Sequence, residues 1–198
     1  MRLVLASGSA ARRAMLEQAG VAFTVDKPNI DEDAVKASLA AAGTNGRDTA
    51  DALAQLKAVK VSARDPAALV LGSDSVVELD DGTLLDKPMS RDDAGAHLRR
   101  LSGKRHRLHS AAVIAEAGRP VWREVDTATL FVRPLGQDFI AAYLDAEWPA
   151  ISGCVGCYRI EGPGAQLFAR IDGSQFTILG LPLLPVLDYL RVRGVLTS

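Results

Sequence analysis

The stretch from Leu3 to Arg13 constrains the fold of this chain more than any other. A short apolar run, Leu3 to Ala6, predicts a buried strand, and the small residues Ser7-Gly8-Ser9 follow it directly. An amphipathic pattern begins there, with Ser9 as the candidate N-cap of a helix and Gly20 as its predicted stop. The chain therefore begins with a strand, a loop of small residues and a helix in succession.

Two arginines fall in the first turn of this predicted helix. The helix dipole disfavours positive charge there by about 0.3–1 kcal/mol per residue. Binding of an anion by the loop, its free N–H groups and Arg12 and Arg13 would offset that cost. The alternative is that both arginines extend over the surface of an ordinary helix. The apolar stripe of the helix is expected from Ala11, Met15, Leu16 and Ala19.

The composition excludes several classes of protein. The chain has 198 residues, with 48% hydrophobic and 24% charged side chains, as in soluble globular proteins. The net charge of −1 argues against a general nucleic-acid coat. No apolar run approaches the roughly 18 residues of a membrane span. Only a four-residue apolar run follows Arg2, so we expect no signal peptide and a cytoplasmic protein.

The two cysteines of the chain, Cys154 and Cys157, form a C-x-x-C motif. A redox motif of this kind follows a strand at a helix N-terminus, whereas this one lies in a glycine-rich loop. A zinc site would need two further ligands, and His97, His106 and His109 lack zinc-finger spacing. We therefore expect two reduced, structural thiols.

Acidic and basic residues occur on two further predicted helices. Asp31-Glu32-Asp33 opens the first, which runs to the alanines before Gly43, and simple capping would explain these acids. The second spans about 49–63, where Lys57 shares a stripe with Leu53 and Val61. A lysine there either extends to solvent along the apolar face or points at an anion. Lys60 lies on another face.

A carboxylate marks the end of a second buried strand, predicted over 67–72. Asp74 follows Gly72, and such a position is common for a metal ligand or a general base. The alternative is a turn-forming residue. A hairpin turn at 80–82 returns the chain to Lys87, which we expect close to Asp74.

The rest of the chain alternates between predicted helices and strands, interrupted by two hairpins, which indicates an α/β fold with a mixed sheet flanked by helices. We expect a second strand at 21–25, a helix from a capping box at 90–93 to Gly103, a hairpin of strands 106–116 and 121–132, a helix around 139–144, a strand at 176–179 and a last helix from 181 to 194.

With these residues identified, the sequence resembles the Maf family of nucleoside triphosphate pyrophosphatases along nearly its whole length. Seven blocks carry the resemblance, each weak alone but specific in this order. They are Leu-Ala-Ser-Gly-Ser at 5–9 with Arg12-Arg13, Asp31-Glu32, the lysine helix 53–58, 72–77 around Asp74, Asp86-Lys87-Pro88, Leu101-Ser102-Gly103 with His106 and Ser110, and 156–162.

The resemblance implies a single Maf-like domain over residues 1–198, with two lobes and an active-site cleft between them. It implies a homodimer in the cytoplasm that binds neither nucleic acid nor membranes. The implied reaction is hydrolysis of a nucleoside triphosphate to the monophosphate and pyrophosphate, dependent on a divalent cation, Mg²⁺ or Mn²⁺.

The resemblance also implies roles for individual residues. Phosphates would be bound by Ser7, Ser9 and positive charge from Arg12, Arg13, Lys57 and Lys87. Glu32 and Asp74 would be the catalytic acids and metal ligands. Asp74 is the expected general base and Glu32 the expected metal ligand, although these two roles could be exchanged.

Two departures from the family pattern bear on the substrate. Many members have Pro and Arg where this chain has Ala10 and Ala11, and the branch that prefers thymidine and uridine triphosphates has Gln where Glu161 stands. Both differences make the chain more similar to the branch associated with 7-methyl-GTP, although Ala11 matches neither branch well. The alternatives are a pyrophosphatase that prefers dTTP and UTP, and a non-catalytic nucleotide-binding regulator of division.

Overall fold

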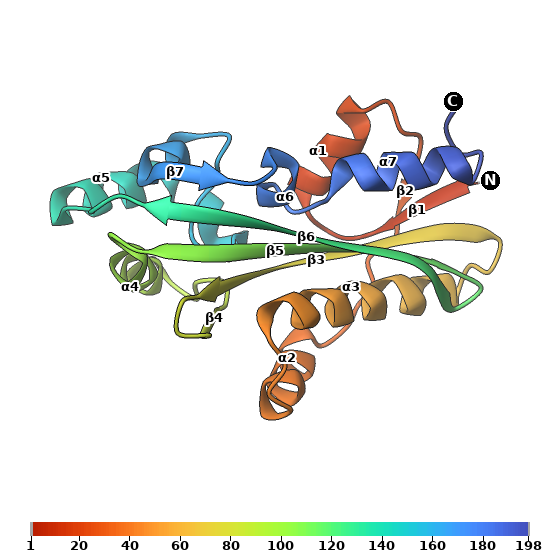
Figure 1. The fold of residues 1–198 in the computed structure, drawn as a ribbon, viewed down its shortest axis with the longest axis horizontal. Helices are drawn as coiled ribbons and strands as arrows, with labels where there is room; N and C mark the ends of the chain where they lie inside the picture. Colours follow the sequence, from red (N-terminus) through yellow and green to blue (C-terminus); the bar gives the residue numbers. More distant parts are fainter. Residues whose placement is uncertain (1, 198) are drawn as a thin grey trace. The chain divides into compact units, whose positions relative to one another are not determined.

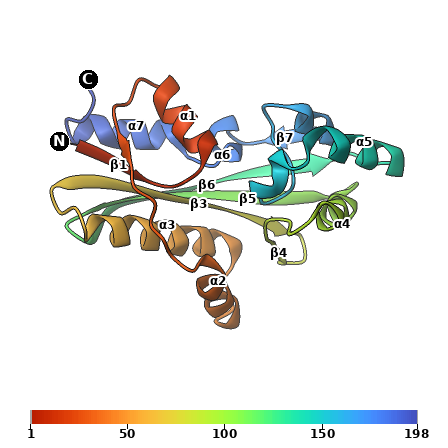
Figure 2. The ribbon, with the colours of Figure 1, turned by 180° about the vertical axis from the view of Figure 1, so that it is seen from behind.

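The computed structural model describes residues 2–197 and shows a mixed β-sheet flanked by helices, as predicted (Figures 1 and 2). Within this range the sheet has seven strands in the order β2-β1-β3-β5-β6-β7, and β4 pairs with β3. The strands are β1 Arg2–Ala6, β2 Thr24–Val25, β3 Ala68–Leu79, β4 Leu84–Leu85, β5 Arg105–Glu116, β6 Arg119–Val132 and β7 Phe168–Asp172. The α-helices are α1 Ala10–Gln18, α2 Glu32–Ala41, α3 Gly46–Ser62, α4 Arg91–Leu101, α5 Gln137–Glu147, α6 Gln175–Ile178 and α7 Leu183–Val192.

The described chain divides into two compact units. The first comprises residues 2–75, 109–126 and 175–197, and the second comprises 76–108 and 127–174. Strands β3, β5 and β6 each contribute residues to both units, so neither unit is a continuous piece of the chain.

The first unit buries both faces of its part of the sheet. Leu3 and Leu5 of β1 belong to an apolar cluster with residues of α1 and α7. Val4 and Ala6, which alternate with them, pack in a second cluster with Val61 of α3. Figures 1 and 2 agree that α1 and α7 cover one face of this part of the sheet and α3 the other. Burial on both faces explains the continuous apolar run of β1.

Helix α3 lies unusually close to β3 at Gly72. A Cβ atom on Gly72 would lie 2.3 Å from the carbonyl oxygen of Ala54 and 2.6 Å from the nitrogen of Ala58. No other residue fits at position 72 unless the helix moves away. Because Lys57 lies in the same turn of α3, this contact holds it against β3.

The second unit contains the hairpin predicted at 80–82. Gly82 has a φ of +80°, and β4 pairs antiparallel with β3, with Val77 opposite Leu85. Ser90 caps α4 by accepting a hydrogen bond from the nitrogen of Asp93, as predicted. The structure adds β7, which pairs antiparallel with β6. The sequence gives no alternation there because this strand has no fully buried residue.

The predicted hairpin of β5 and β6 is confirmed, and its turn is tighter than expected. Ala117 and Gly118 both have positive φ angles, +48° and +75°, as in a type I′ turn. The second strand therefore begins at Arg119 rather than at residue 121.

Three other predicted elements differ from the structure. The segment 176–179 falls mostly in helix α6 rather than a strand, because a segment of four residues is too short to distinguish the two periodicities. The chain does not leave the sheet after Gly72, since β3 continues to Leu79 and contains Asp74. Only Thr24–Val25 of the predicted strand 21–25 pairs with β1.

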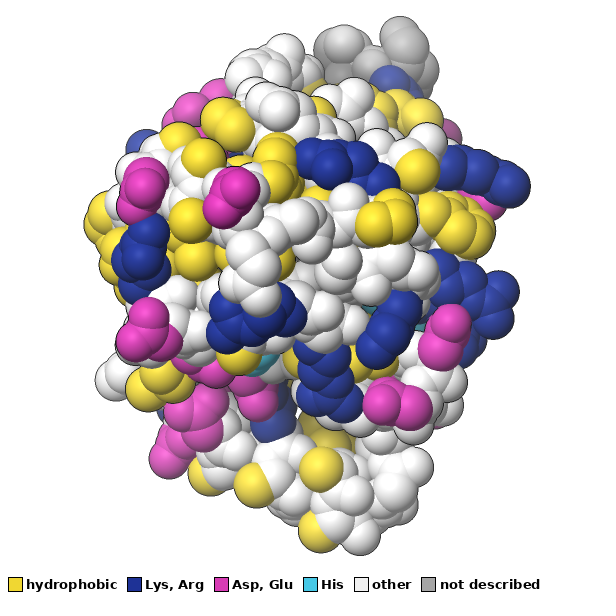
Figure 3. Space-filling model, turned by 90° about the vertical axis from the view of Figure 1, so that its left-hand side faces the viewer, with side chains coloured by type: hydrophobic (Ala, Val, Ile, Leu, Met, Phe, Trp, Pro, Cys, Tyr) yellow, Lys and Arg dark blue, Asp and Glu magenta, His cyan; other side chains and the backbone are white. Residues whose placement is uncertain are grey.

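No helix within residues 2–197 is both long and apolar enough to cross a bilayer. Figure 3 shows basic, acidic and hydrophobic side chains together on one face of the molecule, in agreement with the net charge of −1.

Candidate active site

Most of the predicted site residues meet at one edge of the first unit, where β1 and β2 end beside β3, which continues to Leu79. β1 is parallel to both β2 and β3, with Leu5 opposite Val25 and Ala6 opposite Gly72. The loop Ser7-Gly8-Ser9 therefore leaves β1 beside Asp74 of β3. In open α/β sheets, ligands bind outside the carboxyl ends of parallel strands.

Arg12 is buried at this edge, with 8% of its surface exposed. Its Nε donates to the carbonyl oxygen of Gly180 at 2.7 Å, Nη1 to Ser7 Oγ at 3.2 Å and Nη2 to Ser75 Oγ at 2.9 Å. Burial lowers the pKa of the guanidinium, and the charges of Asp74 and Glu32 oppose that shift. Three of its five N–H groups are thereby engaged, which leaves two for an anion.

Arg13 lies on the other side of α1. Its side chain is exposed and its Nε lies 3.5 Å from Glu17 Oε1. Ser9 caps the helix, as predicted, by accepting from the nitrogen of Arg12. The structure thus brings Arg12, but not Arg13, together with the other site residues.

Lys57 connects the two predicted catalytic acids. Its Nζ lies 2.5 Å from Asp74 Oδ1 and 2.9 Å from Glu32 Oε1, and only 5% of the residue is exposed. Asp31 caps α2 by accepting from the nitrogen of Ala34, whereas Glu32 turns toward Lys57. The ammonium therefore does not extend to solvent, and capping does not explain Glu32.

The carboxylates of Glu32 and Asp74 suit a hard divalent cation. Mg²⁺ prefers oxygen ligands and is commonly bound by one or two carboxylates together with substrate phosphates. Residues 2–197 contain no group of three or more potential metal-ligating His, Cys, Asp or Glu side chains. These two acids thus fit a metal shared with a phosphate ligand, rather than a cation enclosed by protein alone.

A hydrogen-bonded group behind Arg12 was not predicted from the sequence. Ser75 Oγ lies 2.9 Å from Ser110 Oγ, which donates to the carbonyl oxygen of Thr177 at 2.7 Å. Gly180 has a φ of +104°, and a Cβ there would lie 3.2 Å from Ser75 Oγ and 3.4 Å from Arg12 Nε. In the sequence, a glycine directly after the short segment 176–179 indicates a turn at Gly180. It does not indicate the contact of Gly180 with Arg12.

Lys87 and Glu161 belong to the second unit. Both side chains are exposed, and the charges of both act on the thiol of Cys154. The loop with Glu161 is attached to α5 by a bidentate ion pair, in which Arg159 Nε and Nη2 lie 2.9 and 3.0 Å from the oxygens of buried Glu147.

The two cysteines are free thiols in surroundings that disfavour reaction. Cys157 is buried with its Sγ 3.4 Å from His97 Nδ1, and burial raises its pKa to about 12. Burial also raises the pKa of Cys154. A thiol reacts as its thiolate. The surroundings of both cysteines agree with the predicted structural role.

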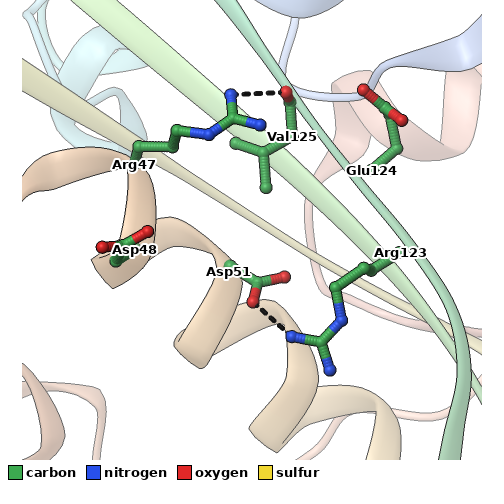
Figure 4. Close-up of a pocket in the computed structure, with 6 residues that line it drawn as sticks. All are labelled: Arg47, Asp48, Asp51, Arg123, Glu124 and Val125. Carbon is green, nitrogen blue, oxygen red and sulfur yellow. Dashed lines mark hydrogen bonds and ion pairs between the residues drawn. The ribbon is translucent and has the colours of Figure 1, made fainter.

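A separate hollow of about 250 Å³ lies between the start of α3 and β6 (Figure 4). Its two arginines are already engaged, because Arg47 donates to the carbonyl oxygen of Val125 and Arg123 pairs with Asp51 and Gln55. None of the predicted site residues lines it.

Comparisons with known proteins identify the family of this chain. The family described as "Maf-like protein" matches residues 2–193. The chain is 50% identical to the "Nucleoside triphosphate pyrophosphatase" of Sphingopyxis alaskensis, over 98% of both chains. It is 53% identical to the "Nucleoside triphosphate pyrophosphatase 1" of Jannaschia sp., again over 98% of both chains. The "Nucleoside triphosphate pyrophosphatase" of Caulobacter vibrioides is 50% identical, over 98% of this chain and 97% of its own. The chain belongs to the Maf family.

Proposed function

We propose that this protein is a nucleoside triphosphate pyrophosphatase, a hydrolase that cleaves the α–β phosphoanhydride to give a nucleoside monophosphate and pyrophosphate. The observation that carries the proposal is the buried Lys57 between Glu32 and Asp74, at the strand edge that also holds Arg12 and the Ser7–Ser9 loop. The names of the relatives support the same reaction.

The residues divide into binding and reacting groups. Arg12, Ser7 and Ser9 bind phosphate oxygens, together with the N–H groups at the start of α1. Asp74 takes a proton from the attacking water, whose oxygen bonds to the α-phosphorus as the bond to the bridging oxygen breaks. A general base of this kind contributes about 10²–10⁴-fold. Lys57 holds Asp74 in place.

Glu32 and Asp74 would hold a divalent cation, Mg²⁺ or Mn²⁺, which would neutralise phosphate charge when bound. Burial supports the assignment of Asp74 as base and Glu32 as ligand, since the Asp74 side chain is 8% exposed and that of Glu32 is 30% exposed. The more enclosed carboxylate is shielded from bulk water. The reverse assignment is the alternative.

The proposed substrate is a modified nucleoside triphosphate such as 7-methyl-GTP, with Glu161 beside the base and Lys87 on the phosphates. A 7-methylguanine base is positively charged, whereas thymine and uracil are neutral. A charge-assisted contact in a partly desolvated pocket contributes about 1.5–3 kcal/mol. The resemblance further supports a cytoplasmic homodimer. The alternative within the family is a preference for dTTP and UTP.

The test is a panel of canonical and methylated nucleoside triphosphates with detection of pyrophosphate. We expect hydrolysis by the wild type and a loss of at least about 10²-fold in Asp74→Asn, which removes the charge at nearly constant volume. Near wild-type hydrolysis by folded Asp74→Asn would contradict the role of Asp74. Nucleotide binding without any turnover would favour a regulator instead.

Glu161→Gln tests the substrate separately. The change removes the carboxylate charge, so we expect kcat/KM for 7-methyl-GTP to fall more than kcat/KM for UTP or dTTP, by about ten- to hundredfold. An equal loss on all substrates would make Glu161 a general site residue and would remove the main support for 7-methyl-GTP.

A further inference from the structure

Lys27 enters the phosphate-binding region because of how β1 and β2 pair. The strands are parallel with Leu5 opposite Val25, and the nitrogen of Asp26 donates to the carbonyl oxygen of Leu5 at 3.1 Å. Lys27 therefore follows β2 at the same level of the sheet at which Ser7 follows β1. Both residues lie at the edge that holds Asp74.

The side chain of Lys27 lies across Gly8, in the middle of the loop Ser7-Gly8-Ser9. A Cβ atom built on Gly8 has only atoms of this lysine as its nearest neighbours, with Cε at 3.4 Å, Cδ at 3.8 Å and Nζ at 4.0 Å. The ammonium is thus within a few ångströms of the loop backbone.

Contacts with Arg64 fix the backbone that carries Lys27. Arg64 Nη2 donates to the carbonyl oxygen of Lys27 at 3.2 Å and lies 2.9 Å from Asp26 Oδ2. These contacts hold the backbone of Lys27 in place. The residue itself is exposed and lies within reach of a ligand on the Ser7–Ser9 loop.

The ammonium of Lys27 is available to bind an anionic ligand, whereas that of Lys57 is already paired with two carboxylates. Glu32 and Asp74 together balance the ammonium of Lys57. Within residues 2–197 no carboxylate forms an ion pair with Lys27. A triphosphate carries several negative charges, so an unbalanced cation beside its binding loop lowers the free energy of the complex.

We propose that Lys27 is a further substrate-binding residue, whose ammonium contacts the phosphate held by the Ser7–Ser9 loop. The proposal rests on the proposed function and adds a cation that the seven motif blocks do not include. Lys27 serves the phosphate chain as a whole and not the bond that breaks. It therefore contributes uniform binding, which is equal in the substrate complex and in the transition state. Such binding changes KM and leaves kcat nearly constant.

The experiment compares Lys27→Ala, Lys27→Gln and Lys27→Arg, with Lys60→Ala as the matched control. Lys60 is an exposed lysine of the same unit whose Nζ donates to the carbonyl oxygen of Asn29 at 2.6 Å. We expect the Ala and Gln variants to raise KM, and the inhibition constant of pyrophosphate, by about five- to twentyfold with kcat within about twofold. Lys27→Arg retains the charge and should remain near wild type, as should Lys60→Ala.

A KM and an inhibition constant unchanged in Lys27→Gln would overturn the proposal, and so would a fall in kcat alone. A wild type that hydrolyses no triphosphate would refute the proposed function instead. Calorimetric titration of pyrophosphate would then test Lys27 by itself. Weaker binding by Lys27→Gln than by wild type and Lys60→Ala would support the proposal, and equal binding by all three would overturn it.

Discussion

Replacement of Lys57 by alanine tests the cluster of Lys57, Glu32 and Asp74, because it removes the ammonium that lies between the two acids. The side chain of Asp74 is 8% exposed and that of Glu32 is 30% exposed, so the first would remain buried without its partner. Removal of one member of a buried ion pair costs about 3–5 kcal/mol. Since Glu32 has partial access to water, we expect about 3 kcal/mol, which lowers Tm by about 6–12 °C in a domain of this size.

The same change should reduce activity. Lys57 holds Asp74 and adds positive charge near the phosphates, so we expect kcat/KM to fall by about 10²-fold. Thermal unfolding and steady-state kinetics with nucleoside triphosphate measure the two effects on one preparation. Lys60→Ala is the control, because Lys60 is exposed and its Nζ donates to the carbonyl oxygen of Asn29 rather than to an acid of the site.

Measurement of Tm with an added divalent cation provides a second test of the same cluster. A ligand that binds the folded state raises stability in proportion to the logarithm of its concentration over Kd. Because Lys57→Ala removes the ammonium that lies between Glu32 and Asp74, Mg²⁺ or Mn²⁺ should raise the Tm of the variant more than that of wild type. Equal effects of Lys57→Ala and Lys60→Ala on both Tm and kcat/KM would refute the reasoning.

Three further predictions concern other parts of the chain. Gly180→Ala should raise KM and lower stability by about 1–3 kcal/mol, because φ is +104° and the new Cβ would crowd Arg12, as thermal unfolding and kinetics would show. Burial lowers the pKa of His106 to about 4 from 6.5, so the unfolded chain binds more protons between these values. Stability should therefore fall as the pH decreases from about 6.5 to 4, by up to about 3 kcal/mol in urea unfolding, and a pH profile unchanged in His106→Gln would contradict this. Lys87→Ala should lower kcat/KM with little change in Tm, since the side chain is exposed, and a Tm loss without a kinetic one would contradict its role.

Local signals in the sequence predicted much of the fold. The caps Ser9 and Ser90 mark helix starts that the structure confirms, because a hydroxyl that accepts an N–H bond needs only residues a few positions away. The turn at Gly82 is likewise decided by its neighbours. The boundaries of β3 could not be predicted, since a small-residue segment ends a strand in one context and permits close helix packing, as at Gly72, in another.

The site depended more on contacts between distant residues. The spacing on α3 selected Lys57 over Lys60 without deciding between solvent and an anion, and only the fold brings Glu32 and Asp74 to it. Gly180 lies 168 positions from Arg12, with which it forms a hydrogen bond. No periodicity within one helix can reveal such a contact. The proposed role of Lys27 could not be predicted from the sequence for the same reason, because its position beside Gly8 depends on strand pairing.

The choice between Arg12 and Arg13 shows what a sequence can still provide. The expected stripe of α1 ran through Ala11 and Ala19, yet Ala19 is exposed and the buried residues are Arg12, Met15 and Leu16. These three are spaced i, i+3 and i+4, which is the spacing of one helix face. Had Arg12 been counted as a member of the stripe, the two large apolar residues alone would have turned it inward and Arg13 outward. Adjacent residues lie about 100° apart on a helix, so the position of the core decides which of two neighbouring arginines can bind a buried anion.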